Sequence, residues 1–191
     1  RALDFDKGLN TGGMGTVAPN PYYTDAIAQE CMDTIFLPTI RAMEAEGRIF
    51  KGCLYFGLML TPNGAKVIEY NCRFGDPETQ VVLPLLDTDF VDIIEAIEEN
   101  RLADLDSKWK EGCAACVVMA SGGYPKKYES GLVISGLDEK GQTNGCFVYH
   151  AGTKIDDNGN IVNAGGRVLG VTATGSTLPE ALATAYEGVK S

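Results

Sequence analysis

The sequence predicts an α+β protein in two parts: helices with an antiparallel hairpin in residues 1–104, then a small β-rich domain in residues 105–191. Three observations support this prediction. Residues 61–64 read Thr-Pro-Asn-Gly between two apolar runs, and Asn-Gly in that setting strongly indicates a hairpin. Apolar residues at helical spacing flank the hairpin. Beyond about residue 104, short strand patterns alternate with glycine-rich turns.

The chain begins with a segment that lacks periodicity. Residues 1–23 are rich in Gly, Pro, Asn and Thr, which predicts a long ordered loop or a ligand-binding loop. A helix follows, with Thr24 as a plausible N-cap, Gly47 able to close its end and Pro38 expected to kink it. Its apolar positions recur every four residues: Ile27, Cys31 and Ile35.

The hairpin and two further helices complete the first part. The expected elements are strands 52–60 and 65–72, a polar loop 73–79, and helices 78–86 and 88–99. Thr88 or Asp89 can cap the last helix. Its apolar face comprises Phe90, Ile93, Ile94 and Ile97.

The second part should contain several strands and one helix. A polar, charged segment at 100–111 places the boundary at about residue 104. The strand patterns lie near 113–120, 132–137, 145–149, 151–156 and 167–174. A helix from about 178 to 190 ends the chain.

Charge and hydropathy exclude some function classes. With 26 acidic and 16 basic residues the net charge is −10, which disfavours general binding to nucleic acids or anionic membranes. A phosphate ligand held locally by a few donors remains compatible with that charge. The most apolar window, residues 53–60, is too short to cross a bilayer. No signal peptide is in view after Arg1, and we expect the chain to begin inside a longer protein.

The six cysteines indicate reduced thiols and a cytoplasmic protein, because their density is well below that of a disulfide scaffold. Cys113 and Cys116 form a C-x-x-C, whose functional interpretation is a redox or zinc pair. We favour a structural interpretation, since the flanking run resembles a buried strand and no second pair exists to complete a zinc site.

The most informative segment is KVIEYNCRFGDPETQ, residues 66–80. On a strand, Val67, Glu69 and Asn71 should share one face. Glu and Asn are poor strand formers, and together they offer a carboxylate and an amide oxygen two positions apart. Magnesium accepts such an all-oxygen half-site and completes its octahedron with water and substrate phosphates. We therefore predict that Glu69 and Asn71 bind a divalent metal.

Three charged residues follow this pair. Arg73 could reach the same phosphates, while Asp76 and Glu78 present carboxylates at the start of a helix. The alternative is a solvated edge strand with a capping aspartate. The density of functional groups favours the metal–phosphate interpretation.

The second informative segment is NTGGMG. It comprises Asn10, Thr11, Gly12, Gly13, Met14 and Gly15. Three glycines in four residues let a backbone approach a ligand closely and turn its N–H groups toward an anion. A simple flexible turn explains these residues equally well.

Two other patterns resemble known binding motifs but do not predict a binding site. Gly13, Gly15 and Ala18 match a dinucleotide fingerprint, but no apolar strand precedes them and prolines follow where a helix should begin. The spacing that opens a calcium loop at Asp156 fails at its glycine and glutamate positions, so we interpret 157–159 as a hairpin turn.

Two single residues stand apart from these motifs. The one histidine, His150, is expected to be structural rather than a catalytic base. For Arg167, a phosphate contact, a contact with the adjoining domain and plain surface exposure are equally open.

The two informative segments closely resemble the phosphoribosylamine–glycine ligase family of the ATP-grasp superfamily. Further stretches agree with this resemblance: MASGGYP at 119–125, HAGT at 150–153 and NAGGRVLGVTATG at 163–175. The resemblance implies that residues 1–104 are the second half of the ATP-grasp domain and 105–191 most of a small C-terminal domain. It also implies that an N-terminal domain and the first half of the ATP-grasp unit precede this chain, which is then inactive alone.

The resemblance carries site residues and chemistry with it. It implies that Glu69 and Asn71 bind Mg²⁺ or Mn²⁺ and that Arg73 faces the nucleotide phosphates as the catalytic residue. It places residues 10–15, with Asp76 and Glu78, around glycine and phosphoribosylamine.

The implied reaction joins these substrates through glycyl phosphate at the expense of ATP, in purine biosynthesis. The alternatives are another ATP-grasp carboxylate–amine ligase or a non-catalytic module that binds an anion or a partner.

Overall fold

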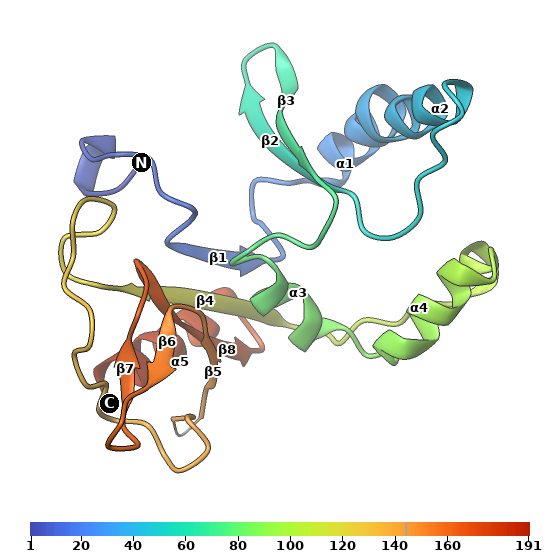
Figure 1. Ribbon diagram of the computed structural model, residues 1–191. Coiled ribbons are helices and arrows are strands. Elements are labelled where there is room, and N and C mark those ends of the chain that lie inside the picture. Colours follow the sequence, from blue (N-terminus) through green and yellow to red (C-terminus); the bar gives the residue numbers. More distant parts are fainter. Residues whose placement is uncertain (144) are drawn as a thin grey trace. The chain divides into compact units, whose positions relative to one another are not determined.

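The computed structural model of this protein describes residues 1–143 and 145–191. Helices and antiparallel sheets make up its elements, which confirms the α+β prediction (Figure 1). The chain divides into two compact units built from interleaved segments. The first unit comprises Arg1–Ala18, Asp76–Leu85 and Lys110–Ser191, and the second comprises Pro19–Gly75 and Leu86–Trp109. The family-domain boundary near residue 104 stays a prediction.

A four-stranded antiparallel sheet is the centre of the first unit. Its strands lie in the order β1 (Gly15–Ala18), β4 (Cys113–Ala120), β8 (Arg167–Gly175) and β5 (Phe147–His150). β4 and β8 are the central strands, and each carries a run of consecutive buried residues, so both faces of the sheet are covered there. The predictions of strands 113–120, 145–149 and 167–174 are confirmed.

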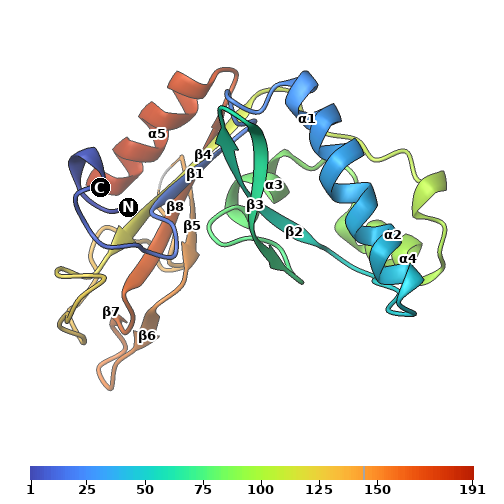
Figure 2. The same cartoon turned by 90° about the horizontal axis from the view of Figure 1, so that it is seen from above.

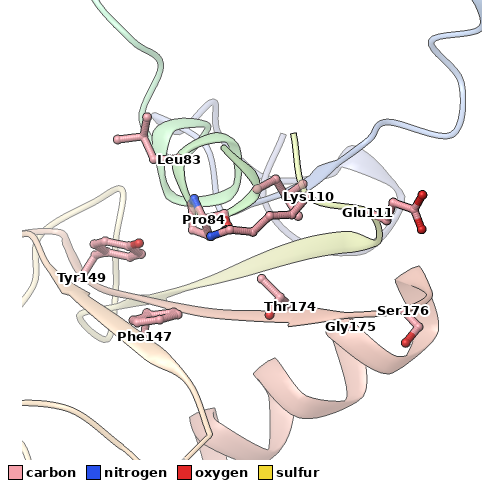
Figure 3. Close-up of a pocket in the computed structure, with 10 residues that line it drawn as sticks. Leu83, Pro84, Lys110, Glu111, Phe147, Tyr149, Thr174, Gly175 and Ser176 are labelled. Carbon is pink, nitrogen blue, oxygen red and sulfur yellow. The ribbon is translucent and has the colours of Figure 1, made fainter. Parts of the chain in front are cut away.

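Two helices cover opposite faces of this sheet, as Figure 3 shows for the part around β8. α3 (Thr79–Leu85) packs Val81 and Leu85 against Ala114 and Cys116 on one face. Fully burying a side chain such as Val81 contributes about 1.5–3 kcal/mol. α5 (Leu178–Lys190) lies along the other face, where Ala181 and Ala185 are fully buried (Figure 2).

Both helical predictions in this unit are confirmed. α5 begins with a capping box, in which the Thr177 side chain accepts from Glu180 N–H and the Glu180 carboxylate accepts from Thr177 N–H. α3 is confirmed within one residue of the predicted range at each end.

Two predictions about strands in this unit are wrong. The expected loop 1–23 contains β1, which has no internal periodicity and exists because it pairs with β4. The expected strand 132–137 forms only a single bridge, between Val133 and Val162. Gly136 has a φ of +83° there, which interrupts an extended strand. The strand predicted at 151–156 is confirmed as β6 (Thr153–Ile155), which pairs across the predicted turn with β7 (Ile161–Asn163), a strand that was not predicted.

The first helical region of the second unit is continuous but irregular. α1 (Asp25–Cys31) starts at Thr24, whose side chain accepts from Ile27 N–H. A π-helical segment, Met32–Phe36, leads into α2 (Leu37–Ala45), which carries Pro38 in its first turn. The predicted irregularity at Pro38 therefore takes the form of a wider turn, because proline cannot donate to the carbonyl four residues earlier.

The predicted hairpin is confirmed. β2 (Tyr55–Thr61) and β3 (Gly64–Asn71) pair across the Pro62-Asn63 turn, and Gly64 takes a φ of +84°. The ring of Phe56 packs against Phe36 and Tyr70, with centroid distances of 4.5 Å and 5.3 Å. This aromatic cluster fixes the hairpin against the preceding helices and leaves the other hairpin face for polar groups.

The last helix of the second unit is α4 (Phe90–Glu98), capped by the Asp89 carboxylate. Its predicted apolar face is only partly covered, because Ile93 and Ile97 are half-buried whereas Phe90 and Ile94 are exposed. Short 3₁₀ turns lie at Asp4–Asp6 and Leu102–Asp104. None of the described helices has the length and apolar character that crossing a bilayer requires.

Candidate functional site

The glycine loop, which we define as residues 10–15, belongs to the first unit and leads into β1. Gly13 has a φ of +102°, and a Cβ atom there would lie 2.7 Å from Cδ of Pro77. Only glycine fits such a position, because its backbone is left-handed and its neighbour is a ring held in the buried interior. The sequence therefore uses Gly13 for close packing as well as for conformation.

Arg167 joins the glycine loop to the turn at Asp76. Its Nη1 donates to the carbonyl oxygens of Gly12 (2.9 Å), Gly13 (3.4 Å) and Asp76 (2.9 Å). Its Nη2 donates to Oδ2 of Asp76 at 2.9 Å and forms an ion pair there. Segments 91 and 155 residues distant along the chain thus meet at one guanidinium.

Asp76 and Glu78 lie in the first unit with the loop. Besides Arg167, the Asp76 carboxylate accepts from Nε2 of Gln80 at 2.8 Å, so both of its oxygens contact protein donors. Glu78 is half-buried at the start of α3, where its carbonyl accepts from the N–H groups of Val81 and Val82. The fold brings Asp76 to the glycine loop, and Asp76 supports the loop's conformation there.

Tyr124 holds the same loop from another side. Its hydroxyl oxygen accepts from Gly12 N–H at 3.2 Å. Its ring lies directly on Gly166, where a Cβ atom would be 2.3 Å from the ring. Gly166 therefore has no room for a side chain, and the ring of Tyr124 packs against the glycine-rich turn before Arg167.

A cavity of about 470 Å³ lies beside Tyr124. Three basic residues, Arg1, Lys7 and Lys126, line it together with Tyr124 and Pro125. In a chain with a net charge of −10, this concentration of positive charge next to the glycine loop suits an anionic ligand.

The predicted metal pair, Glu69 and Asn71, belongs to the second unit and stands near the end of β3. Nδ2 of Asn71 donates to Oε1 of Glu69 at 3.0 Å, so the two side chains lie on one face and touch. Glu69 is exposed and Asn71 half-buried. The pair is neither splayed apart nor sealed in an apolar interior.

A bulge corrects one part of the predicted face. β3 pairs Glu69 with Gly57 and Val67 with Leu58, so Ile68 is the extra residue and the alternation shifts there. Val67 therefore faces the side of Phe56 and Tyr70, not that of Glu69 and Asn71. Opposite Glu69, a Cβ atom on Gly57 would lie 2.9 Å from Cγ of Glu69, so Gly57 leaves room for the carboxylate side chain.

The donor set of this pair fits a hard cation such as Mg²⁺. It offers carboxylate and amide oxygens, and its exposure leaves space for water and phosphate oxygens. Across the described residues, no group of three or more His, Cys, Asp or Glu side chains is placed to hold a metal. A cation at Glu69 and Asn71 would thus take most of its ligands from solvent and substrate.

Arg73 follows the pair in the polar loop and is exposed. Its Nη1 donates to the carbonyl oxygen of Phe74 at 2.8 Å. Phe74 packs its ring on Phe90 at a centroid distance of 5.6 Å, which anchors this loop within the second unit.

The Cys113–Cys116 motif lacks the geometry of a redox pair. All six cysteines are free, and Cys113 and Cys116 stand three residues apart on β4, so their side chains point to opposite faces. Burial raises the pKa of the Cys116 thiol. Neither observation fits a reactive redox pair.

The histidine and the rejected calcium loop are structural as well. The ring nitrogens of His150 lie 3.1 Å from Thr153 Oγ1 and 2.8 Å from the Gly141 carbonyl oxygen. Asp156 accepts from the backbone of Asn158 and Asn160, which closes the β6–β7 turn as predicted. These contacts lower the pKa of Asp156, mainly through the Asn160 backbone.

A second cavity, of about 530 Å³, lies within the first unit, between α3 and strands β5 and β8 (Figure 3). Phe147 and Tyr149 on β5 and Thr174 on β8 face it, and Lys110 reaches across to donate to the Pro84 carbonyl oxygen at 3.2 Å. That ammonium group neutralises the carboxyl end of α3.

The glycine loop, Asp76, Tyr124 and Arg167 form what we call the glycine-loop cluster, and two of its residues carry weak sequence signals. Arg167 follows a glycine-rich turn, which is equally common on protein surfaces. Tyr124 is one of eight tyrosines and has no regular spacing to other motifs. The signal that could have found them is the Gly-Gly pair that precedes each one in the sequence, because such pairs allow rings and guanidinium groups to approach a backbone.

Comparisons with known proteins agree on one family. The model "Phosphoribosylglycinamide synthetase, ATP-grasp (A) domain" matches residues 1–79, and "Phosphoribosylglycinamide synthetase, C domain" matches residues 114–191. The phosphoribosylamine–glycine ligase of Caldanaerobacter subterraneus is 49% identical over 100% of this chain and 45% of its own length. A bifunctional purine biosynthetic protein of Dictyostelium discoideum is 42% identical over 100% of this chain and 26% of its own length.

Solved structures give the same result. The crystal structure of phosphoribosylamine–glycine ligase from Thermotoga maritima is 36% identical, with a TM-score of 0.75 over 98% of this chain and 45% of that one. A pyruvate carboxylase of Rhizobium etli, 16% identical with a TM-score of 0.62, shares the fold alone. The chain spans less than half the length of the ligases it matches. Two domain models of one family together cover most of the sequence, and the chain therefore belongs to the phosphoribosylglycinamide synthetase family.

Proposed function

We propose that the complete protein containing this chain joins glycine to 5-phosphoribosylamine, with conversion of ATP to ADP and phosphate, as a step of purine biosynthesis. One observation carries the proposal: a single model of this family covers the glycine loop and the Glu69–Asn71–Arg73 segment together. The chain spans 45% of the length of a related ligase, and we assign the residues that would hold the nucleotide base to a part of the complete protein upstream of this chain.

Two residues of β3 are assigned to the divalent metal. Glu69 and Asn71 would hold Mg²⁺ or Mn²⁺ through their side-chain oxygens, and the contact between the two side chains keeps these oxygens on one face. The metal, when bound, neutralises charge on the triphosphate. Phosphoryl transfer needs charge neutralisation and alignment more than covalent help, so an exposed pair open to phosphate suits it.

Arg73 is assigned to the transferring phosphoryl group as the catalytic residue. Its guanidinium charge would offset the negative charge that develops there. A carboxylate oxygen of glycine forms a bond to the γ-phosphorus while the bond to ADP breaks, which gives glycyl phosphate. The reaction needs no nucleophilic side chain.

The glycine loop is assigned to the acceptor substrates. Asn10 to Gly15, with Asp76 and Glu78 beside them, would position glycine and phosphoribosylamine by backbone donors without side-chain bulk. The amine nitrogen of phosphoribosylamine then bonds to the carbonyl carbon of glycyl phosphate, loses a proton and displaces phosphate. The basic cavity beside Tyr124 supports an anionic acceptor in this region.

The isotope content of the released phosphate tests this function. The complete protein, supplied with ATP, phosphoribosylamine and glycine labelled with ¹⁸O in its carboxylate, should release phosphate that carries one ¹⁸O atom. Unlabelled phosphate would contradict an acyl phosphate. Labelled phosphate formed equally well with other amines would indicate a different carboxylate–amine ligase. Residues 1–191 alone should show no turnover.

The cellular setting is part of the proposal. We assign the complete enzyme to the cytoplasm, because all six thiols of this chain are free and free thiols are typical of a reducing compartment. Two of them, Cys31 and Cys116, are buried. Cysteine labelling in intact cells before lysis would detect any oxidised pair.

A further inference from the structure

We propose that Arg167 is a positioning residue that orients the glycine loop for its substrates, an inference that rests on the proposed function. Its guanidinium contacts three backbone carbonyls and one carboxylate, drawn from the glycine loop and the Asp76 turn. Those are the two segments assigned to the acceptor substrates. The side chain itself is largely buried, with 22% of its surface exposed.

The contacts need an arginine. A guanidinium presents five N–H donors in a rigid plane, so Nη1 can serve carbonyl oxygens while Nη2 serves Asp76. A lysine ammonium carries its three donors on one atom and cannot span both groups. The loop is also shaped for this plane, since a Cβ atom on Gly12 would lie 3.1 Å from Cζ of Arg167.

The guanidinium sets the direction of the loop's peptide groups. In a trans peptide the carbonyl and the following N–H point in opposite directions. The described cis bonds fall at Asp76-Pro77 and Tyr124-Pro125, so the loop peptides are trans. With the Gly12 and Gly13 carbonyls bound to Arg167, the N–H groups of Gly13 and Met14 point away from it. Oγ1 of Thr11 accepts from the Gly13 N–H at 3.3 Å, so an anion would replace that hydroxyl as its acceptor. Successive N–H groups on one side form the arrangement that binds carboxylates and phosphates.

A buried polar network anchors the turn that carries Arg167. The amide of Asn163 donates to Ser121 Oγ and to the Glu129 carbonyl oxygen, both at 2.7 Å. Ser121 Oγ in turn donates to the Gly165 carbonyl oxygen at 2.7 Å. Asn163 and Ser121 are almost fully buried. Arg167 therefore extends from a fixed base, and its hydrogen bonds order the loop rather than follow it.

Steady-state kinetics of the complete protein test this role with R167M, R167K and R167A. R167M should lower kcat/KM for glycine and phosphoribosylamine by about 100-fold, because small displacements of substrate-positioning groups have effects of that size. The KM for ATP should not change. R167K keeps the charge but not the fork and should recover little activity. Guanidinium ion added to R167A should restore activity, and the same ion should not help R167K.

The control is R101M, since Arg101 also pairs with a carboxylate, that of Glu99, and has 42% of its side-chain surface exposed. It should behave as wild type. Wild-type kinetics for glycine and phosphoribosylamine in folded R167M would overturn the proposal. A KM for ATP that rises as much as the KM values for glycine and phosphoribosylamine would overturn it as well. If R167M fails to fold, R167K and rescue of R167A decide the question. Absence of ligation by the wild-type protein would instead refute the proposed function.

Discussion

The glycine-loop cluster and the Glu69–Asn71 pair achieve order in different ways. The cluster joins residues that are 91 to 155 positions apart, and most of its polar groups contact other protein groups. The pair joins residues two positions apart on one strand, is open to solvent, and depends on few neighbours. Long-range contacts suit a rigid binding site for small substrates. An exposed pair suits a cation whose other ligands are water and phosphate oxygens.

Substitution of the pair should have the largest effect on activity and almost none on stability. In the complete protein, E69Q or N71A should lower kcat by more than about 100-fold, since even outer-shell metal partners typically contribute 10- to 100-fold. The melting temperature should barely move, because surface substitutions usually change the free energy of unfolding by about 0.5 kcal/mol or less. E44Q, at an exposed glutamate of α2, is the control. Unchanged metal dependence of activity in both variants would remove them from the metal site.

Substitution within the cluster should affect stability and activity together. G13A forces a side chain into a left-handed backbone and against Pro77, which should destabilise the protein by about 1–3 kcal/mol and lower kcat/KM for glycine. G131A is the matched control, because Gly131 has a φ of +87° with nothing within 4 Å of the added Cβ atom. Thermal melts and kinetics of both variants separate steric contact from backbone strain. Equal melting temperatures for the two would show that the Pro77 contact does not matter.

Coupling between residues sharpens the comparison further. Asp76 and Arg167 act through one contact, so the double variant D76N/R167M should be less impaired than the sum of the single effects. Residues in direct contact typically show interaction energies of about 0.5–3 kcal/mol. Melting temperatures and kcat/KM of the four proteins in this cycle provide the measurement. Strict additivity would mean that the two side chains act independently.

The rate of cysteine alkylation should show the smallest difference between the two regions. Cys72 is exposed beside Asn71, whereas Cys116 is buried beneath α3. Since only the thiolate reacts and burial raises the pKa of Cys116, its alkylation should be slow at pH 7 and should require a higher pH than an ordinary thiol. Mass spectrometry after iodoacetamide treatment at several pH values measures this. Rapid labelling of Cys116 at pH 7 would indicate that the sheet opens readily.

Contacts between near neighbours in the sequence could be predicted better than contacts between distant segments. The hairpin, α5 and the Glu69–Asn71 contact could be predicted because turn chemistry, caps and strand alternation act between near neighbours. The bulge at Ile68 escaped prediction, since it depends on how β2 and β3 pair rather than on the composition of β3. β1 escaped prediction, and a contact between Arg167 and the first part of the chain was only one of three open roles, because each exists only when distant segments meet.

Binding of Mn²⁺ to the complete protein tests the central claim most directly. Electron paramagnetic resonance titrations, with a non-hydrolysable ATP analogue present, would compare wild type, E69Q/N71A and R167M. We predict that E69Q/N71A binds Mn²⁺ at least about 10-fold more weakly than wild type and that R167M binds it normally. Unchanged Mn²⁺ affinity in E69Q/N71A would contradict a cation held by Glu69 and Asn71.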